Sequence, residues 1–335
     1  MSYQDFYKLS DKEKLEIFNS TSDKVGIPPV AIEKDWWVVR TLEVIFGMTV
    51  AKHLVFKGGT SLSKSWKLID RFSEDIDLAL DKSFLGFDKD KISRTQVGKL
   101  RDASFEYIST NFFPKLRERF IQAGLDVTIQ LEEVKTTDQD PLIIEIYYRP
   151  ITPQSEYIQP RVLVEIGSRS LREPFTDCNI QSFIGEHFST RPFADPPILI
   201  PSVNPERTFL EKLFLLHEEF QRPKEKIRVN RLSRHLYDIY RISQSPHAKN
   251  AMDDTELFMS IVEHRKTFAR LGGVDYKSHY PPNLSSLPPQ ELRKDWEADY
   301  QTMREEMIYG TIPSFDQLIG AIETVLNKVN AIATQ

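Results

Sequence analysis

The stretch from Val55 to Leu80 constrains this chain more than any other segment. It reads VFKGGTSLSKSWKLIDRFSEDIDLAL, which predicts a strand end, a turn at Gly58-Gly59, a short helix and a second strand. Successive side chains of a strand point to opposite faces, so Asp75 and Asp77 share one face. Two carboxylates beside a glycine turn at a helix start favour a site for a divalent cation and a phosphate chain.

The glycine turn and the short helix supply candidate contacts for that phosphate chain. Glycine lets the main chain approach a ligand closely, and the N–H groups at a helix start favour anions. Two hydroxyl side chains and two lysines in the same stretch add donors and positive charge. The predicted nucleotide-binding residues are Lys57, Gly58, Gly59, Thr60, Ser61 and Lys64.

Length, charge and cysteine content narrow the class of protein. A chain of 335 residues is expected to form one large or two smaller domains. Its net charge of −5 argues against broad coating of nucleic acid but leaves room for a local basic patch. The one cysteine, Cys178, excludes an internal disulfide, and no signal-like or membrane-spanning apolar run is evident. We therefore expect a cytoplasmic protein without membrane partners.

Hydrophobic periodicity divides the chain into a mixed first part and a helical second part. Helices are predicted over residues 10–47 and 82–123, and strands over 125–131, 142–148 and 161–166. The proline-rich stretch 186–205 is interpreted as a linker, after which the pattern is helical. The predicted domains are residues 1–200 and residues 201–335.

Three charged residues precede two tryptophans in the helix predicted over residues 30–46. The run is Glu33-Lys34-Asp35-Trp36-Trp37. One interpretation is an amphipathic helix with its tryptophans in the core. The other places Lys34 or Asp35 at the rim of the candidate site.

Glu165 interrupts an otherwise apolar strand. Val162, Val164 and Ile166 share one face, so Glu165 lies on the opposite face, where a buried acid needs a partner or a cation. A salt bridge to Arg161 or Arg169 would satisfy it. Alternatively, Glu165 is the third carboxylate of the metal site, beside Asp75 and Asp77.

Two polar residues of the helical part are also candidates. Lys212 lies at the edge of an apolar stripe on the helix after Asn204-Pro205, where it either extends to solvent or brings a charge to the site. Asp238 either forms a pair one helical turn from Arg234 or lines the site as a polar wall. The sequence leaves both alternatives open.

The segment from Arg222 to His235 is the most basic part of the chain. It holds six lysine or arginine residues and one glutamate. Such a rim suits an RNA backbone, and binding of that kind weakens steeply as salt is added. The predicted RNA-binding residues are Arg228, Arg231 and Arg234.

Several blocks of sequence, in order, resemble the AbiEii/AbiGii toxin family of the DNA polymerase beta-type nucleotidyltransferases. The blocks are Ile32-Glu33-Lys34-Asp35, Phe56-Lys57-Gly58-Gly59-Thr60-Ser61-Leu62, Phe72-Ser73-Glu74-Asp75-Ile76-Asp77-Leu78, Arg207-Thr208-Phe209-Leu210-Glu211-Lys212-Leu213 and Ser233-Arg234-His235-Leu236-Tyr237-Asp238-Ile239.

The resemblance implies an α+β nucleotidyltransferase fold, with a mixed sheet flanked by helices and a helical C-terminal lobe that completes the active-site cleft. It also implies transfer of a nucleotide from NTP to the 3′ end of tRNA, which blocks translation, and an antitoxin encoded nearby. Such toxins serve in phage defence or growth control. The family's metal-binding acids fall on Asp75 and Asp77, and its conserved lysine and later aspartate on Lys212 and Asp238.

These expectations combine into one catalytic hypothesis. Asp75, Asp77 and Glu165 hold Mg²⁺, and Glu165 can also act as general base. Lys212 contacts the triphosphate, and Asp238 orients Lys212 or binds the base or ribose. Two other functions stay open: a nucleotidyltransferase that modifies a protein or a small molecule, and a nonenzymatic module that binds nucleotides or proteins.

Overall fold

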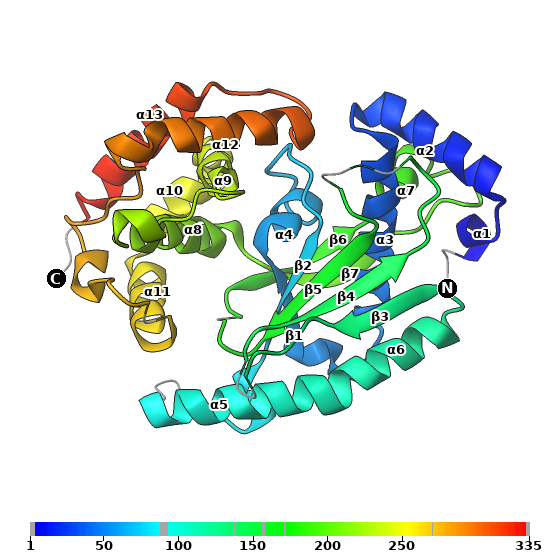
Figure 1. Cartoon of the computed structure of the whole chain (residues 1–335), viewed down its shortest axis with the longest axis horizontal. Coiled ribbons are helices and arrows are strands. Elements are labelled where there is room, and N and C mark those ends of the chain that lie inside the picture. Colours follow the sequence, from blue (N-terminus) through cyan, green and yellow to red (C-terminus); the bar gives the residue numbers. More distant parts are fainter. Residues whose placement is uncertain are drawn as a thin grey trace. The chain divides into compact units, whose positions relative to one another are not determined.

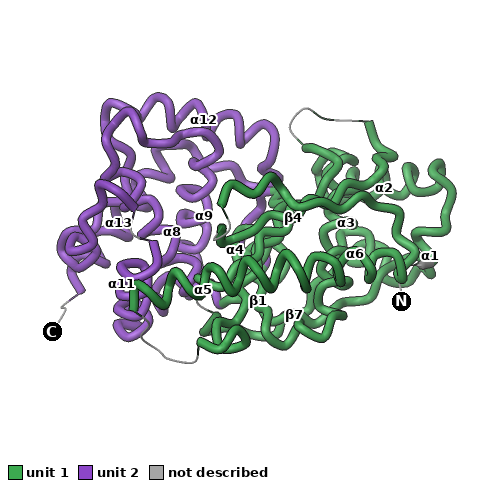
Figure 2. The backbone as a smooth tube through the Cα atoms, turned by 60° about the horizontal axis from the view of Figure 1, so that its bottom comes forward, with its two compact units in different colours: residues 1–66, 72–203 green, residues 67–71, 204–335 purple. Residues whose placement is uncertain are grey.

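A computed structural model describes residues 4–87, 93–136, 139–153, 155, 158–170, 172–269 and 271–332. The chain forms two units, which Figure 2 shows in different colours. Unit 1 comprises residues 1–66 and 72–203, and unit 2 comprises residues 67–71 and 204–335. The chain therefore passes from unit 1 into unit 2 at residue 67 and returns to unit 1 at residue 72, which the sequence pattern did not predict.

Unit 1 combines a sheet with helices (Figure 1). Its helices are α1 (Gln4–Tyr7), α2 (Asp11–Val25), α3 (Pro29–Phe46), α4 (Gly58–Lys64), α5 (Arg94–Tyr107), α6 (Phe113–Gln122) and α7 (Phe183–His187), with the short turns η1 (Thr49–His53), η2 (Lys82–Leu85) and η3 (Ile108–Phe112). Its strands are β1 (Leu54–Lys57), β2 (Asp75–Leu80), β3 (Val127–Leu131), β4 (Leu142–Tyr148), β5 (Arg161–Gly167), β6 (Phe175–Ile180) and β7 (Ile198–Val203).

The sheet is mixed, as predicted. In the described residues its strand order is β3-β4-β5-β2-β1-β7-β6. The central strand β2 is antiparallel to β1 and parallel to β5. Helix α3 packs on β2 and β5, while α4 contacts β1 and β2. The sheet therefore places β2, the strand with the two candidate aspartates, at its centre.

The interpretation of residues 186–205 as a linker is wrong. Residues 198–203 form β7, which pairs with β6 over its whole length and with β1 at Ser202. Proline cannot donate a hydrogen bond, so Pro201 suggested a break. The pairing of β7 with β1 is limited to the single register position Phe56–Ser202, which leaves room for a neighbouring proline.

The charged run at the start of α3 lies in the interior of unit 1. Glu33 accepts hydrogen bonds from the main-chain N–H groups of Ile151 and Thr152, at 2.8 and 3.0 Å. Lys34 forms an ion pair with Glu74, with an Nζ–Oε2 distance of 2.6 Å, and both side chains are buried. Since Glu74 directly precedes Asp75, this pair fixes the beginning of β2.

Asp35, the third residue of the charged run, is also buried. It pairs with Lys64 of α4 at 2.7 Å and accepts the main-chain N–H of Phe183 at 2.8 Å. Trp36 and Trp37 are core residues, as the first alternative predicted. Three buried charges on one helix thus connect α3 to residues 151–152, to Glu74, to α4 and to α7.

Unit 2 is helical apart from its short segment 67–71. Its helices are α8 (Pro205–Phe220), α9 (Ser233–Ser243), α10 (Pro246–Asp253), α11 (Thr255–Phe268), α12 (Arg293–Glu306) and α13 (Phe315–Val329), with the short turns η4 (Lys224–Lys226), η5 (Tyr276–His279) and η6 (Gln290–Leu292). Helix α9 packs against α8, α10, α12 and α13, which makes it the central helix of the unit. No described helix is long and apolar enough to cross a membrane.

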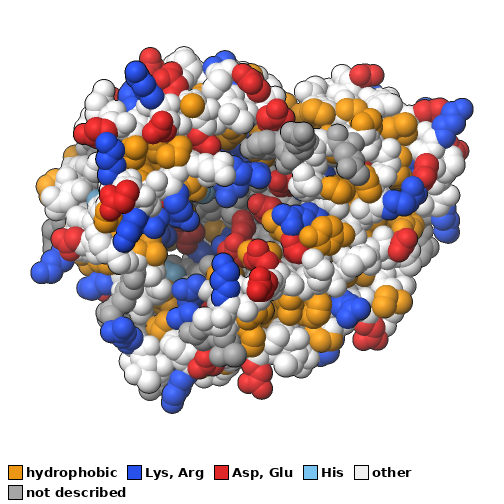
Figure 3. All heavy atoms as spheres, in the orientation of Figure 1, with side chains coloured by type: hydrophobic (Ala, Val, Ile, Leu, Met, Phe, Trp, Pro, Cys, Tyr) orange, Lys and Arg blue, Asp and Glu red, His pale blue; other side chains and the backbone are white. Residues whose placement is uncertain are grey.

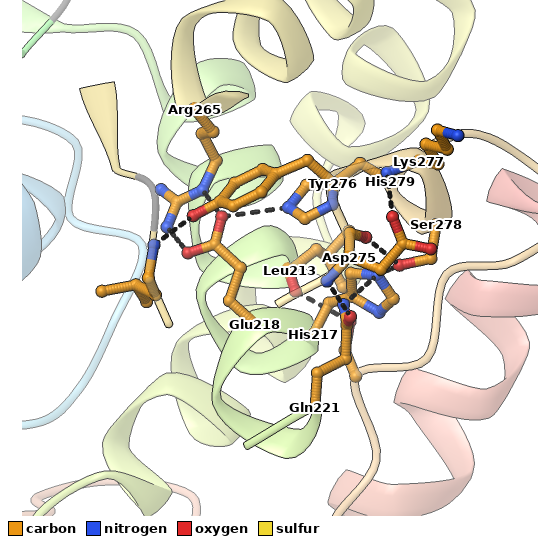
Figure 4. Close-up of polar contacts among 12 residues, drawn as sticks. Leu213, His217, Glu218, Gln221, Arg265, Asp275, Tyr276, Lys277, Ser278 and His279 are labelled. Atoms are coloured by element: carbon orange, nitrogen blue, oxygen red, sulfur yellow. Dashed lines mark hydrogen bonds and ion pairs between the residues drawn. The ribbon is translucent and has the colours of Figure 1, made fainter. Parts of the chain in front are cut away.

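A buried polar network fixes the segment around η5 on α8 (Figure 4). Glu218 accepts hydrogen bonds from Arg265 at 2.6 Å and from His279 at 3.0 Å. His217 accepts the main-chain N–H of Ser285 at its Nδ1 atom, at 3.0 Å, while its Nε2 atom lies 2.9 Å from the Ser278 hydroxyl. The Nε2 atom of His217 also lies 2.9 Å from the side-chain amide nitrogen of Gln221.

Burial lowers the pKa of His217 from 6.5 to about 4. The unfolded chain therefore binds this proton first as the pH falls, which favours unfolding below about pH 6.5. We expect this histidine alone to lower the free energy of unfolding by about 2 kcal/mol between pH 7 and pH 5. Urea unfolding of wild type and His217→Gln at both pH values measures it. An equal loss in the two proteins would contradict the expectation.

Candidate active site

Strand β2 presents its two aspartates on the more open face of the sheet. Asp75 and Asp77 are partly exposed, whereas Ile76 and Leu78 are buried on the opposite face. The parallel register pairs Asp77 with Glu165 of β5. Side chains at paired positions lie on the same face and are close neighbours, so the structure brings Glu165 beside Asp77.

The Asp77 carboxylate lies directly against Gly58. A Cβ atom added to Gly58 would lie 1.9 Å from Oδ2 of Asp77, and the φ angle of Gly58 is +80°. Both facts require glycine at this position, because other residues rarely adopt such a φ angle and the space is already taken. The first glycine of the turn therefore makes room for the carboxylate.

The carboxylates suit a divalent metal ion by their chemistry. Asp77 has no hydrogen bond or ion pair with another described side chain, so its oxygens are available as ligands. In the described parts of the chain, no group of three His, Cys, Asp or Glu side chains converges to hold a metal ion. Mg²⁺ commonly uses one or two carboxylates together with substrate phosphates, which Asp75 and Asp77 fit. Glu165 as a third metal ligand stays a prediction.

The two lysines predicted to bind phosphate have different surroundings. Lys64 is 5% exposed, lies in the ion pair with Asp35 and sits over the ring of Phe183 at 4.0 Å. Its charge is thus used inside unit 1. Lys57, by contrast, is partly exposed, pairs in register with Asp77 and forms no ion pair among the described residues. We therefore keep Lys57 and not Lys64 as a phosphate contact.

The hydroxyl residues of the turn are buried. Thr60 donates to the Ser73 hydroxyl at 2.9 Å, which connects α4 to the segment before β2. Ser61 has a buried Oγ atom without a hydrogen-bond partner in the described structure. Gly59 is the second residue of α4. These residues shape the turn, and their contacts with a nucleotide remain predictions.

In unit 2, Lys212 and Asp238 lie next to each other. The Nζ atom of Lys212 lies 2.9 Å from Oδ2 of Asp238 and 3.2 Å from Nδ1 of His235. Burial lowers the pKa of Lys212, and Asp238 partly opposes that shift. Asp238 forms no ion pair with Arg234, so the alternative that paired these two residues is wrong. Its other partner is Arg71.

Arg71 was missed at the level of the sequence. Its Nε and Nη2 atoms bind the two carboxylate oxygens of Asp238 at 2.7 and 2.8 Å, and both side chains are buried. Burial alone would raise the pKa of Asp238, but the charges of Arg71 and Lys212 hold it well below its usual range. No periodicity marks Arg71, because its partner lies 167 positions away.

The predicted RNA-binding arginines differ in how they are held. Arg228 binds the buried Glu219 at 3.1 and 2.7 Å, although its side chain is 61% exposed. Arg231 donates its main-chain N–H to Asp299 at 2.6 Å. Arg234 forms no ion pair with a described side chain, which leaves its charge available.

Comparison with known proteins identifies the family. The model described as "Nucleotidyl transferase AbiEii toxin, Type IV TA system" matches residues 45–321, which contain the candidate residues from Lys57 to Asp238. The chain belongs to this family. It is therefore a toxin-type nucleotidyltransferase of a type IV toxin–antitoxin system, and AbiEii membership implies an NTP substrate and an antitoxin partner.

Other comparisons are more distant. No curated protein matches this chain. The solved structure of MenT4, a nucleotidyltransferase toxin from Mycobacterium tuberculosis, matches this chain with 16% sequence identity and a TM-score of 0.42. The match covers 96% of this chain and 100% of the MenT4 chain.

The contact between Gly58 and Asp77 leads to a mutational prediction. In Gly58→Ala, the Asp77 carboxylate must turn away, and nucleotidyl transfer should fall by about 100-fold. Gly86→Ala is the matched control, since Gly86 has a similar φ angle of +85° but open space around it. Both variants should lose about 1 kcal/mol of stability. Equal activity of the two variants would contradict a role for this contact.

The lysines give a second pair of variants. Lys64→Met leaves Asp35 buried without its cation and should lower the free energy of unfolding by about 3 kcal/mol. Lys57→Met should change stability by less than about 0.5 kcal/mol but raise the KM for NTP. Thermal unfolding and steady-state kinetics test both. A stable Lys64→Met protein with a raised KM would reverse these assignments.

Proposed function

We propose that this toxin transfers a nucleoside monophosphate from NTP to the 3′ end of tRNA, with Mg²⁺ as its metal, and thereby blocks translation. One observation carries the proposal: in a chain of the AbiEii family, Asp77 is held against Gly58 on the same face as Asp75. The same proposal makes the protein a cytoplasmic toxin that acts in phage defence or growth control, because tRNA and NTP are found in the cytoplasm.

The residues of unit 1 prepare the reacting groups. Asp75 and Asp77 would hold the metal, which neutralises charge on the triphosphate and orients it. Lys57 adds a positive charge from the strand beside Asp77. Helix α4 has only seven residues, so its dipole contributes little to phosphate binding.

The bond changes follow from the chemistry of nucleotidyl transfer. The 3′ hydroxyl oxygen of the acceptor attacks the α-phosphorus of NTP, and a new P–O bond forms. The bond from that phosphorus to the bridging oxygen breaks, and pyrophosphate leaves. Glu165, paired in register with Asp77, accepts the hydroxyl proton in our proposal.

Unit 2 supplies positive charge. We assign Lys212 to the phosphate chain and the leaving pyrophosphate, with Asp238 holding its amine in place. For the RNA acceptor we retain Arg228, Arg231 and Arg234. Positive and negative side chains are interspersed on the face shown in Figure 3, which fits a local rather than a general affinity for RNA.

Incubation with each labelled NTP, total tRNA and Mg²⁺ tests the proposal. Wild type should label tRNA, and Asp77→Asn should lower the rate by at least about 1000-fold, since it removes the negative charge of a metal ligand. Asp177→Asn, which changes an exposed aspartate of β6, is the matched control and should retain activity.

The outcome also separates the possible acceptors. Transfer to tRNA should weaken steeply with added salt, because arginines release counterions from the RNA backbone. Labelling of a protein or a small molecule instead, with little dependence on salt, would contradict the tRNA assignment. The absence of any label with all four NTPs would contradict the enzyme assignment.

A further inference from the structure

One carboxylate in unit 2 holds two cations. Arg71 binds both oxygens of Asp238, and Lys212 binds the same Oδ2 atom at 2.9 Å. Arg71 is 2% exposed, Asp238 0% and Lys212 7%. Such a group is unusual, because buried charges need partners and here one carboxylate contacts two buried cations.

The surroundings of Lys212 add no further negative charge. Its other contact is Nδ1 of His235, and burial, together with the charges of Lys212 and Arg234, holds the pKa of His235 well below its usual range. His235 is thus a neutral acceptor. Among the described residues, Lys212 forms an ion pair with no acid other than Asp238. Arg234, another positive charge, lies four positions before Asp238 on the same helix.

We propose that Arg71 is a positioning residue. It neutralises the negative charge of Asp238, so that the positive charge of Lys212 remains available to attract the phosphate chain. This inference rests on the proposed use of NTP, and it names the polyphosphate portion as the group that Lys212 recognises. The phosphates then supply Lys212 with negative charge that Asp238, which it shares with Arg71, supplies only in part.

The geometry explains why the residue is arginine. A guanidinium binds both oxygens of one carboxylate with a fixed fork, whereas a lysine makes a point contact. Without Arg71, Asp238 would pair with Lys212 alone, and their charges would cancel. Lys212 would then attract phosphate weakly, even though it still lay in the same place.

Binding of inorganic tripolyphosphate, measured by calorimetry without an acceptor or Mg²⁺, tests the inference. Arg71→Met and Lys212→Met should each weaken binding by at least about 10-fold. The double variant should bind no more weakly than Lys212→Met, because Arg71 acts through Lys212. Arg71→Lys should bind with intermediate affinity and raise the KM for NTP more than it lowers kcat.

Arg241→Met provides a matched control. Arg241 lies on α9 and pairs with Asp70, so it anchors the same segment 67–71 without touching Asp238. Its variant should bind tripolyphosphate like wild type. Equal weakening by Arg241→Met would show that Arg71 only anchors the segment and would overturn the inference, as would wild-type affinity in Arg71→Met. If Arg71→Met does not fold, wild-type affinity in Arg71→Lys overturns it.

These results are separable from those on the acceptor. Loss of tripolyphosphate binding in Arg71→Met, together with no transfer to tRNA by wild type, would reject the proposed acceptor and leave the role of Arg71 standing. Transfer to tRNA by wild type, with no tripolyphosphate binding that depends on Arg71, would do the reverse.

Discussion

The close approach of the Asp77 carboxylate to Gly58 is the constraint on which the candidate site depends. A side chain at residue 58 would occupy the position of Oδ2, so glycine and aspartate must occur together. Antiparallel pairing of β1 with β2 brings the two residues into contact, and parallel pairing with β5 adds Glu165. The mixed sheet thus brings acidic residues from distant parts of the sequence next to one another.

Buried ion pairs fix segments within each of the two units. Lys34 secures the residue before Asp75, Asp35 secures α4 through Lys64, and Arg71 secures Asp238. Buried ion pairs contribute little net stability compared with apolar residues, but breaking one is costly. Their value here lies in geometry, since each pair has one arrangement that satisfies both partners.

The sequence predicted those features that local patterns determine. Alternation predicted the strands β2, β4 and β5 and placed Asp75 and Asp77 on one face beside the glycine turn, whereas the central place of β2 in the sheet came only from the structure. Pro201 concealed β7, because a strand with proline resembles a linker. The partners of Lys64 and Arg71 were not predictable, since ion pairs between distant residues leave no periodic signal. The helix pattern and the family resemblance pointed to Lys212 and Asp238, but not to Arg71, which binds Asp238.

The central claim is that Asp75 and Asp77 receive the metal and the triphosphate on the open face of the sheet. A crystal structure with Mn²⁺ and a non-hydrolysable NTP analogue tests it most directly, because Mn²⁺ gives an anomalous signal. The account predicts that signal at the oxygens of Asp75 and Asp77, with phosphate oxygens completing the coordination. A triphosphate bound elsewhere, with both aspartates free of metal, would contradict it.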